Sequence, residues 1–109
     1  MAGKFVCSKS KDGQDQFVLK ASNGQVILTS ERYKSAKSCA NGIESVRKNS
    51  QDENRFETKT AKDGRTYFIL KATNGQAVGK SQMYKSGSGC ANGIKSVAEN
   101  APGAEVVHV

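Results

Sequence analysis

The chain contains an internal duplication. When the sequence is shifted by 51 positions, residues 5–49 align with residues 56–100 without a gap, and 23 of the 45 aligned positions are identical. The longest shared run is Cys39-Ala40-Asn41-Gly42-Ile43, which returns at positions 90–94. Units this similar fold alike. The chain therefore forms the same unit twice, and the two copies must share a core, because about 50 residues alone make a marginal one.

Each unit begins with a pattern of short strands joined by tight turns. Asp12-Gly13 and Asn23-Gly24 are dipeptides that supply the positive φ of hairpin turns. Between them, Phe17 and Leu19 alternate with residues of the other face, which is the period of a strand. A further strand is predicted at about residues 25–30, and the same pattern follows in the second unit.

The period then changes to that of a helix. Apolar residues recur at helical spacing and form one stripe: Ala36, Cys39, Ala40, Ile43 and Val46. Ser35 is placed to cap the start of this helix, and Asn49 to end it in the left-handed conformation. The second unit predicts an equivalent helix from about Ser86 to Asn100.

The C-terminal tail continues the repeat. A further 51-residue step places Val107 where Phe56 stood, so residues 105–109 are expected to form the opening strand of an incomplete third unit. This strand completes the sheet after the second helix, as a strand at about residues 55–60 does after the first.

These elements predict an α+β fold with the order βββα-βββα-β. We expect one mainly antiparallel sheet with both helices on one face, related by a pseudo-twofold axis, because two helices with one apolar stripe each cover only one sheet face. Residues 1–109 then form a single domain built from two repeats, at about 3–51 and 54–102, with a closing strand at 105–109. Since duplication completes the sheet within one chain, we expect a monomer that acts as a pseudo-dimer.

The motifs of the two units resemble those of the YegP-like family of small bacterial proteins, in its tandem-duplicated form. Four patterns carry the resemblance and occur in both units: D-G turns, F-x-L-K-A-x-N-G-Q, S-x-x-Y, and N-G-I-x-S-V-x-x-N. The resemblance covers about residues 3–109. It implies a β3-α-β unit used twice in one sheet with exchanged C-terminal strands, and it brings no established activity.

The chain is basic and polar. It carries 17 Lys and Arg against 10 Asp and Glu, a net charge of +7, and its mean hydropathy is −0.60. No apolar run approaches the roughly 20 residues of a membrane span, and the start lacks the apolar stretch of a secretory signal, so we expect a cytoplasmic protein with no membrane partner. Residues 1–50 carry +5 and residues 51–109 carry +2. The first unit should therefore dominate any binding to nucleic acid or another polyanion.

The sequence offers no catalytic constellation. Its single histidine, His108, is next to the last residue, which is a poor place to hold a base rigidly. Cys7, Cys39 and Cys90 form no C-x-x-C pair, and with one histidine they do not complete an ordinary zinc site. We expect buried, reduced thiols, with a Cys39–Cys90 disulfide across the pseudo-twofold axis as the lesser alternative. We therefore predict no enzyme, no metal and no cofactor.

Two glycines stand out because they lie in the middle of the predicted helices. Glycine there costs about 1 kcal/mol relative to alanine, yet both units have it, at Gly42 and Gly93. This favours a helix that passes very close to its neighbour or to the sheet over a ligand contact. Tyr33 and Tyr84 are predicted to be packing residues that seal the start of each helix.

The segments that lead into the two helices are the first candidate site. They combine lysines, hydroxyls and free backbone N–H groups at the positive end of a helix dipole, which favours anions. The anion-binding candidates are Lys34, Ser35, Lys37, Ser38, Lys85, Ser86 and Ser88. Ordinary N-capping with solubilising lysines is the simpler interpretation of the same residues.

The sheet face that the helices leave uncovered is the second candidate. Lys20, Lys71 and Tyr67 are expected to point there, and a basic sheet with an aromatic side chain is typical of single-stranded nucleic-acid platforms. A polar face exposed to water is the simpler interpretation, because only Tyr67 is available for stacking and Gln16 takes its place in the first unit.

We therefore predict a small non-enzymatic binding module. The first hypothesis is weak binding of nucleic acid or another polyanion through the basic segments that lead into the helices, motivated by the net charge. The alternative is a protein-interaction or structural module that uses sheet edges or the open sheet face. A third class, a small-anion site or an enzyme, rests only on the glycine-rich segment at 85–89.

Overall fold

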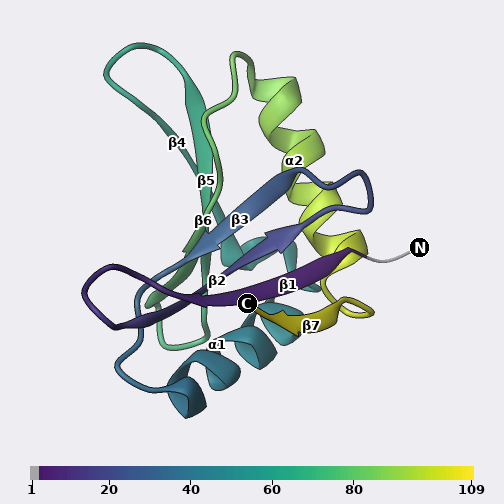
Figure 1. Ribbon diagram of the computed structural model, residues 1–109. Helices are drawn as coiled ribbons and strands as arrows, with labels where there is room; N and C mark the ends of the chain where they lie inside the picture. The colour runs from purple at the N-terminus through teal and green to yellow at the C-terminus, as the bar shows by residue number, and fades with distance from the viewer. Residues whose placement is uncertain (1–2) are drawn as a thin grey trace.

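The structure, a computed structural model, describes residues 3–109 (Figure 1). Its elements follow the order expected from the sequence. In chain order they are β1 (Lys4–Lys9), β2 (Asp15–Lys20), β3 (Val26–Ser30), α1 (Ala36–Asn49), a short 3₁₀ helix η1 (Glu53–Arg55), β4 (Phe56–Thr60), β5 (Thr66–Lys71), β6 (Ala77–Lys80), α2 (Gly87–Asn100) and β7 (Glu105–His108). Within these described residues, neither helix is long and apolar enough to cross a membrane.

The strands of residues 3–109 form one sheet in the order β4-β5-β6-β3-β2-β1-β7. β3 and β6 meet at its centre, so the pseudo-twofold axis runs between them and relates β2 to β5 and β1 to β4. Neighbouring strands are antiparallel except β1 and β7, which are parallel. The predicted α+β fold, with a mainly antiparallel sheet and two helices, is confirmed.

The core lies between the sheet and the two helices. Its sheet side is made by alternate strand residues that are fully buried: Phe5, Phe17, Leu19, Phe68 and Leu70. The helices cover this layer with the predicted apolar stripe, which includes the buried residues Ile43, Val46 and Val97. The period-two and helical patterns of the sequence therefore meet in a single core.

The predicted turns form at their glycines. Gly13 and Gly24 have φ angles of 82° and 87°, in the region that favours glycine, and their repeats Gly64 and Gly75 have 88° and 84°. Asp12 stabilises the first turn by accepting a hydrogen bond from the amide two residues later, at 3.2 Å. These turns fix the register of the hairpins that carry the core residues.

Both helices begin and end at the predicted residues, but the end of α1 has a different conformation. Ser35 and Ser86 each accept a hydrogen bond at 3.1 Å from the amide three residues later. The prediction that Asn49 ends its helix in the left-handed conformation is wrong, because within residues 3–109 only glycines have positive φ and the chain continues through Ser50 at −65°. Asn49 is buried instead, and its side-chain amide donates to the Ser45 carbonyl at 2.8 Å.

The mid-helix glycines mark close packing, as the sequence favoured. A Cβ at Gly42 would lie 2.6 Å from Cζ of Tyr33 and 3.1 Å from the Phe17 ring. Tyr33 stacks on Phe17 with ring centroids 6.2 Å apart, so the tyrosine ring is wedged between helix and sheet. Gly93 has the same relation to Tyr84, whose Cζ would also lie 2.6 Å away. The two tyrosines therefore set how closely each helix approaches the sheet.

The C-terminal strand forms at the predicted residues but does not act as the opening strand of a third unit. β7 follows the helix of the second unit and lies beside β1 of the first, so this strand is exchanged, as the family resemblance implied (Figure 1). In its parallel pairing with β1, Val106 lies beside Phe5 and packs against the core.

Replacing Gly42 with alanine should destabilise the protein, although alanine favours the helix by about 1 kcal/mol. The added methyl group would press on Tyr33 and Phe17, and overpacking of this kind costs about 1–3 kcal/mol. Gly87→Ala is the matched control, because no heavy atom would lie within 4 Å of a Cβ there and Ala36 occupies the same position in the first unit. Thermal unfolding should give a lower Tm for Gly42→Ala and an unchanged or higher Tm for Gly87→Ala. An unchanged Tm for Gly42→Ala would contradict the close packing of Tyr33 between α1 and the sheet.

Candidate functional site

The segment that leads into α1 uses its hydroxyls internally. Ser35 Oγ accepts from the Ser38 amide to cap the helix and donates to Ser38 Oγ at 3.1 Å, so both hydroxyls are bonded within the segment. Lys34 and Lys37 are exposed, and in the described part of the chain neither forms an ion pair. Capping accounts for the serines, which leaves the two lysines as available positive charges.

The segment that leads into α2 has the same arrangement and lies far from the segment that leads into α1. Ser86 Oγ caps the helix and lies 3.2 Å from Ser88 Oγ, and Lys85 is exposed. The two helices begin at opposite sides of the molecule (Figure 1). The structure therefore does not bring the predicted anion-binding residues of the two units together into one site.

In the second unit, the charged side chains of the open sheet face interact with their own neighbours. Lys71 Nζ lies 2.9 Å from a carboxylate oxygen of Glu57, which also pairs with Lys59 at 3.2 Å. Hydrogen bonds from these lysines hold the pKa of the Glu57 carboxyl below its usual value. The Lys80 ammonium lies 4.7 Å from the centroid of the Tyr67 ring. This cation occupies a face of the aromatic ring that a nucleic-acid base would need for stacking.

Lys20 lies apart from these residues, in the other half of the sheet. It is directly opposite Lys4 of β1, and β3 and β6 separate it from Lys71. Val6 stands where Glu57 stands in the second unit, and among residues 3–109 no carboxylate lies within 4.0 Å of Lys20. The three predicted open-face residues therefore do not form one cluster.

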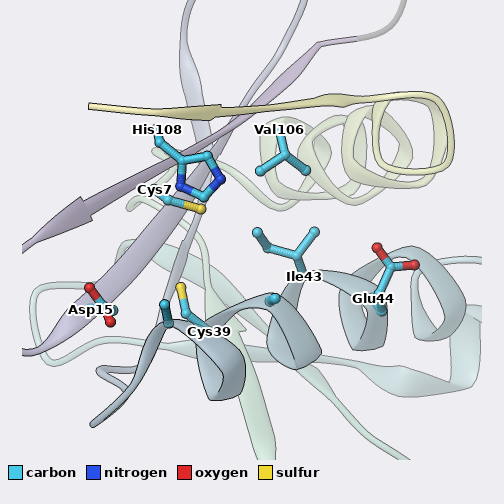
Figure 2. Close-up of a pocket in the computed structure, with 9 residues that line it drawn as sticks. Cys7, Asp15, Cys39, Ile43, Glu44, Val106 and His108 are labelled. Atoms are coloured by element: carbon cyan, nitrogen blue, oxygen red, sulfur yellow. The ribbon is translucent and has the colours of Figure 1, made fainter.

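A cavity between α1 and the β1–β7 pair brings together side chains that the sequence had not joined. Figure 2 shows Cys7 from β1, Cys39 from α1, His108 from β7 and Asp15 from β2 around it. Its volume, including the mouth, is about 450 Å³. His108 is held by strand pairing: it lies beside Cys7, and the next amide donates to the Cys7 carbonyl at 3.0 Å. The histidine is therefore fixed in a strand, contrary to the expectation from its terminal position.

The chemistry of this cavity is that of protonated thiols. Burial raises the pKa of Cys7 and raises that of Cys39 to about 11, and a protonated thiol is a poor nucleophile. Among residues 3–109, no three His, Cys, Asp or Glu side chains are placed to hold a metal ion.

The three cysteines are free and buried, as expected. The alternative, a bond between Cys39 and Cys90, is wrong, because all three thiols are free. Cys39 lies at the same cavity as Cys7 of its own unit (Figure 2).

The outer edge of β4 faces no other strand of the described chain. Phe68 of β5 uses both backbone groups toward β6: its amide donates to Ser81 Oγ, and its carbonyl accepts from the Ser81 amide, each at 2.9 Å. Thr58 of β4 lies directly opposite Phe68. The N–H and C=O of Thr58 therefore point away from β5. On β1, β7 binds the equivalent carbonyl, that of Cys7.

A groove runs between this edge and α2. It measures about 1240 Å³ including its open side. Its lining includes Phe56 and Thr58 from β4, Ala91, Ile94, Lys95 and Ala98 from α2, and Ser50, Gln51 and Glu53 from the segment between α1 and β4. Under the 51-residue step, residues of this groove are equivalent to residues of the cavity beneath β7. In the first unit, Val106 and His108 of β7 close that cavity. Within residues 3–109, no strand closes the groove.

The exposure of two equivalent phenylalanines shows the difference between the edges. Phe5 is 0% exposed and has the Arg47 guanidinium 5.5 Å from its ring centroid. Phe56 is only half-buried, and Ala98 stands where Arg47 stands in the first unit. The sequence had indicated sheet edges in general but missed this one. The sequence contained one signal for the open edge: the C-terminal tail supplies a single closing strand, whereas the two repeats have two equivalent edge strands.

The raised pKa of Cys39 should make the protein less stable in alkaline solution. Between the ordinary thiol pKa of 9.0 and about 11, the unfolded thiol ionises while the folded one stays protonated, so the free energy of unfolding falls as pH rises. Urea denaturation across this range should show a shallower fall for Cys39→Ala than for Cys90→Ala, the matched control, because Cys39 has the larger shift. Equal slopes in the two variants would contradict this assignment.

The chain is similar to known bacterial proteins along most of its length. The family described as Domain of unknown function (DUF1508) matches residues 10–57 and again residues 61–107. UPF0339 protein PA0329 of Pseudomonas aeruginosa is 54% identical over 102 residues, which cover 94% of this chain and 93% of that protein. UPF0339 protein YegP of Escherichia coli K12 is 55% identical over 100 residues, which cover 92% of this chain and 91% of that protein.

Two solution NMR structures share the fold. The structure of E. coli YegP, described as a protein of unknown function, has a TM-score of 0.94 at 52% identity and covers 99% of this chain and 93% of its own. The structure of UPF0339 protein SO3888 from Shewanella oneidensis has a TM-score of 0.93 at 49% identity and covers 99% of this chain and 92% of its own. Together with the two DUF1508 matches, these similarities show that the chain belongs to the UPF0339 family of DUF1508 proteins.

Proposed function

We propose that the protein is a non-enzymatic interaction module that binds an extended segment of another protein as an eighth strand beside β4. The observation that carries the proposal is the difference between the two edges: β7 covers β1, whereas no strand of residues 3–109 covers β4. Peptides that add to a sheet edge gain affinity from main-chain hydrogen bonds and specificity from adjoining pockets. β4 offers both an unpaired backbone and an adjoining groove.

The first unit provides a template for such a complex. β7 is four residues long, runs parallel to β1 and places Val106 against the core. Arg47 of α1 donates to the Ala104 carbonyl at 2.7 Å, which holds the segment that leads into β7. Since the pseudo-twofold axis relates β4 to β1, a segment added to β4 meets an equivalent strand from Phe56 onward.

The side chains of β4 leave this edge open to a partner. Charges on edge strands commonly discourage unspecific pairing, and β4 carries Glu57 and Lys59. Both are held on the open face by ion pairs, with each other and with Lys71. They therefore oppose indiscriminate association without covering the outward N–H and C=O of Thr58.

A synthetic peptide with the sequence of residues 101–109 should bind the intact protein, because it contains the β7 strand. In NMR titrations it should shift the amide signals of β4 and of the part of α2 around Ile94. Thr58→Pro removes an outward N–H without breaking a bond to β5, so it should abolish binding, whereas Thr58→Val, the matched control, should retain it. Absence of shifts at β4, or shifts confined to β1, would overturn the proposal.

A second candidate function is weak binding of nucleic acid or another polyanion. It is supported by the exposed lysines at the helix starts, Lys34, Lys37 and Lys85, which form no ion pair in the described chain, and by the net charge of +7. Lys34 and Lys37 lie in the more basic first unit.

Fluorescence anisotropy with short DNA and RNA at low salt tests this candidate. Affinity should fall as salt increases, since phosphate contacts release counterions, and Lys34→Glu with Lys37→Glu should weaken binding more than Lys85→Glu. Thr58→Pro should leave it unchanged, which separates this activity from strand addition. Absence of binding at low salt would exclude the candidate.

A further inference from the structure

The β7 strand shows which side chains a segment needs at this kind of edge. Beside β1, Glu105 lies opposite Lys4 and Val106 lies opposite Phe5. Val106 faces Ile43 of α1 across the cavity (Figure 2). An acidic residue beside a cation is thus followed by an apolar residue beside an aromatic ring.

The 51-residue step gives the matching positions in the second unit. Arg55 and Phe56 stand where Lys4 and Phe5 stand, and Ile94 of α2 replaces its counterpart on α1. Arg55 ends η1 and pairs with Asp52 at 3.5 Å, so a segment beside β4 meets the apolar floor of Phe56 and Ile94 without a free cation at the position of Lys4.

The rim of the groove is more basic than the template. Lys95 stands where Glu44 stands in the first unit. Figure 2 shows Glu44 on the side of Val106 that faces away from His108, which is the side from which the chain enters β7. Lys95 lines the groove, is exposed, and has no carboxylate within 4.0 Å among residues 3–109. The residues of a partner that precede its apolar side chain therefore pass Lys95 on the helix side of the groove.

The groove also has room for a larger side chain than valine. In the first unit the Arg47 guanidinium lies over the Phe5 ring. Ala98 takes that position in the second unit and lines the groove, and the Phe56 ring is only half-buried. A leucine, isoleucine or phenylalanine of a partner would remove this ring from water.

We infer that the partner segment is an extended stretch in which one or two acidic residues directly precede a large aliphatic or aromatic residue, and that it runs parallel to β4. The inference rests on the proposed function and adds the chemistry of the partner. Its acidic residues pair with Lys95, and its apolar residue packs on Phe56 and Ile94. A basic or uniformly polar segment makes neither set of contacts.

Five peptides test the inference against the intact protein by fluorescence anisotropy. The first keeps the sequence of residues 101–109 with two glutamates at the positions of Ala104 and Glu105 and leucine at that of Val106. The second has lysines for the glutamates, the third has serine for the leucine, and the fourth is a scramble of the first. The fifth is the unchanged sequence. The first should bind roughly tenfold more tightly than the second, third and fourth.

Charge reversal in the protein provides the matching test. Lys95→Glu should weaken binding of the diglutamate peptide and strengthen binding of the dilysine peptide, whereas Lys85→Glu, a matched exposed lysine on the approach to α2, should change neither. If all five peptides bind within about twofold of one another and Thr58→Pro abolishes binding, the partner chemistry is wrong and strand addition stands. If no peptide binds, or binding survives Thr58→Pro, the proposed function itself is overturned.

Discussion

The contact between β3 and β6 at the pseudo-twofold axis joins the two halves into one sheet. Only Thr29 with Lys80 and Ser30 with Gly79 pair there. Equivalent residues meet at a twofold axis, and Leu28 and Gly79 are equivalent under the 51-residue step. A Cβ at Gly79 would come within 2.8 Å of the Leu28 side chain. A large residue from one unit thus fits against the smallest one from the other, an arrangement that two identical subunits could not adopt. α1 and α2 contact strands across this junction and close it from the helix side.

The sequence predicted those parts of the fold that depend on local chemistry. Strand alternation around Phe17, the glycine turns and the serine caps each rest on a few neighbouring residues, and all were confirmed. The conformation of Asn49 at the end of α1 was predicted wrongly, because this residue can either adopt the left-handed conformation or bond back to the preceding turn, and its burial decides between them.

The candidate site depends on long-range placement, and the sequence predicted less of it. Cys7 and Cys39 are both apolar-face residues, but their contact requires knowing which turn of α1 lies over which residue of β1. The open edge of β4 depends on β7 lying parallel to β1 of the other unit. The two repeats have similar sequences and predict similar units. One continuous chain connects them, however, and it supplies a closing strand to only one of the two sheet edges. Function is therefore best sought at positions where the two units differ, such as Arg47 and Ala98.

The parallel pairing of β1 and β7 also has a mechanical consequence. These strands lie near the start and the end of the described chain and are joined side by side along their length (Figure 1). In a parallel pair, the beginning of one strand and the end of the other lie at opposite ends of the ladder. A force that pulls the beginning of β1 away from the end of β7 therefore loads all the hydrogen bonds between them in shear at once, instead of opening them one by one. The fold should consequently resist extension best along this direction, with its two ends acting as a clamp across both units.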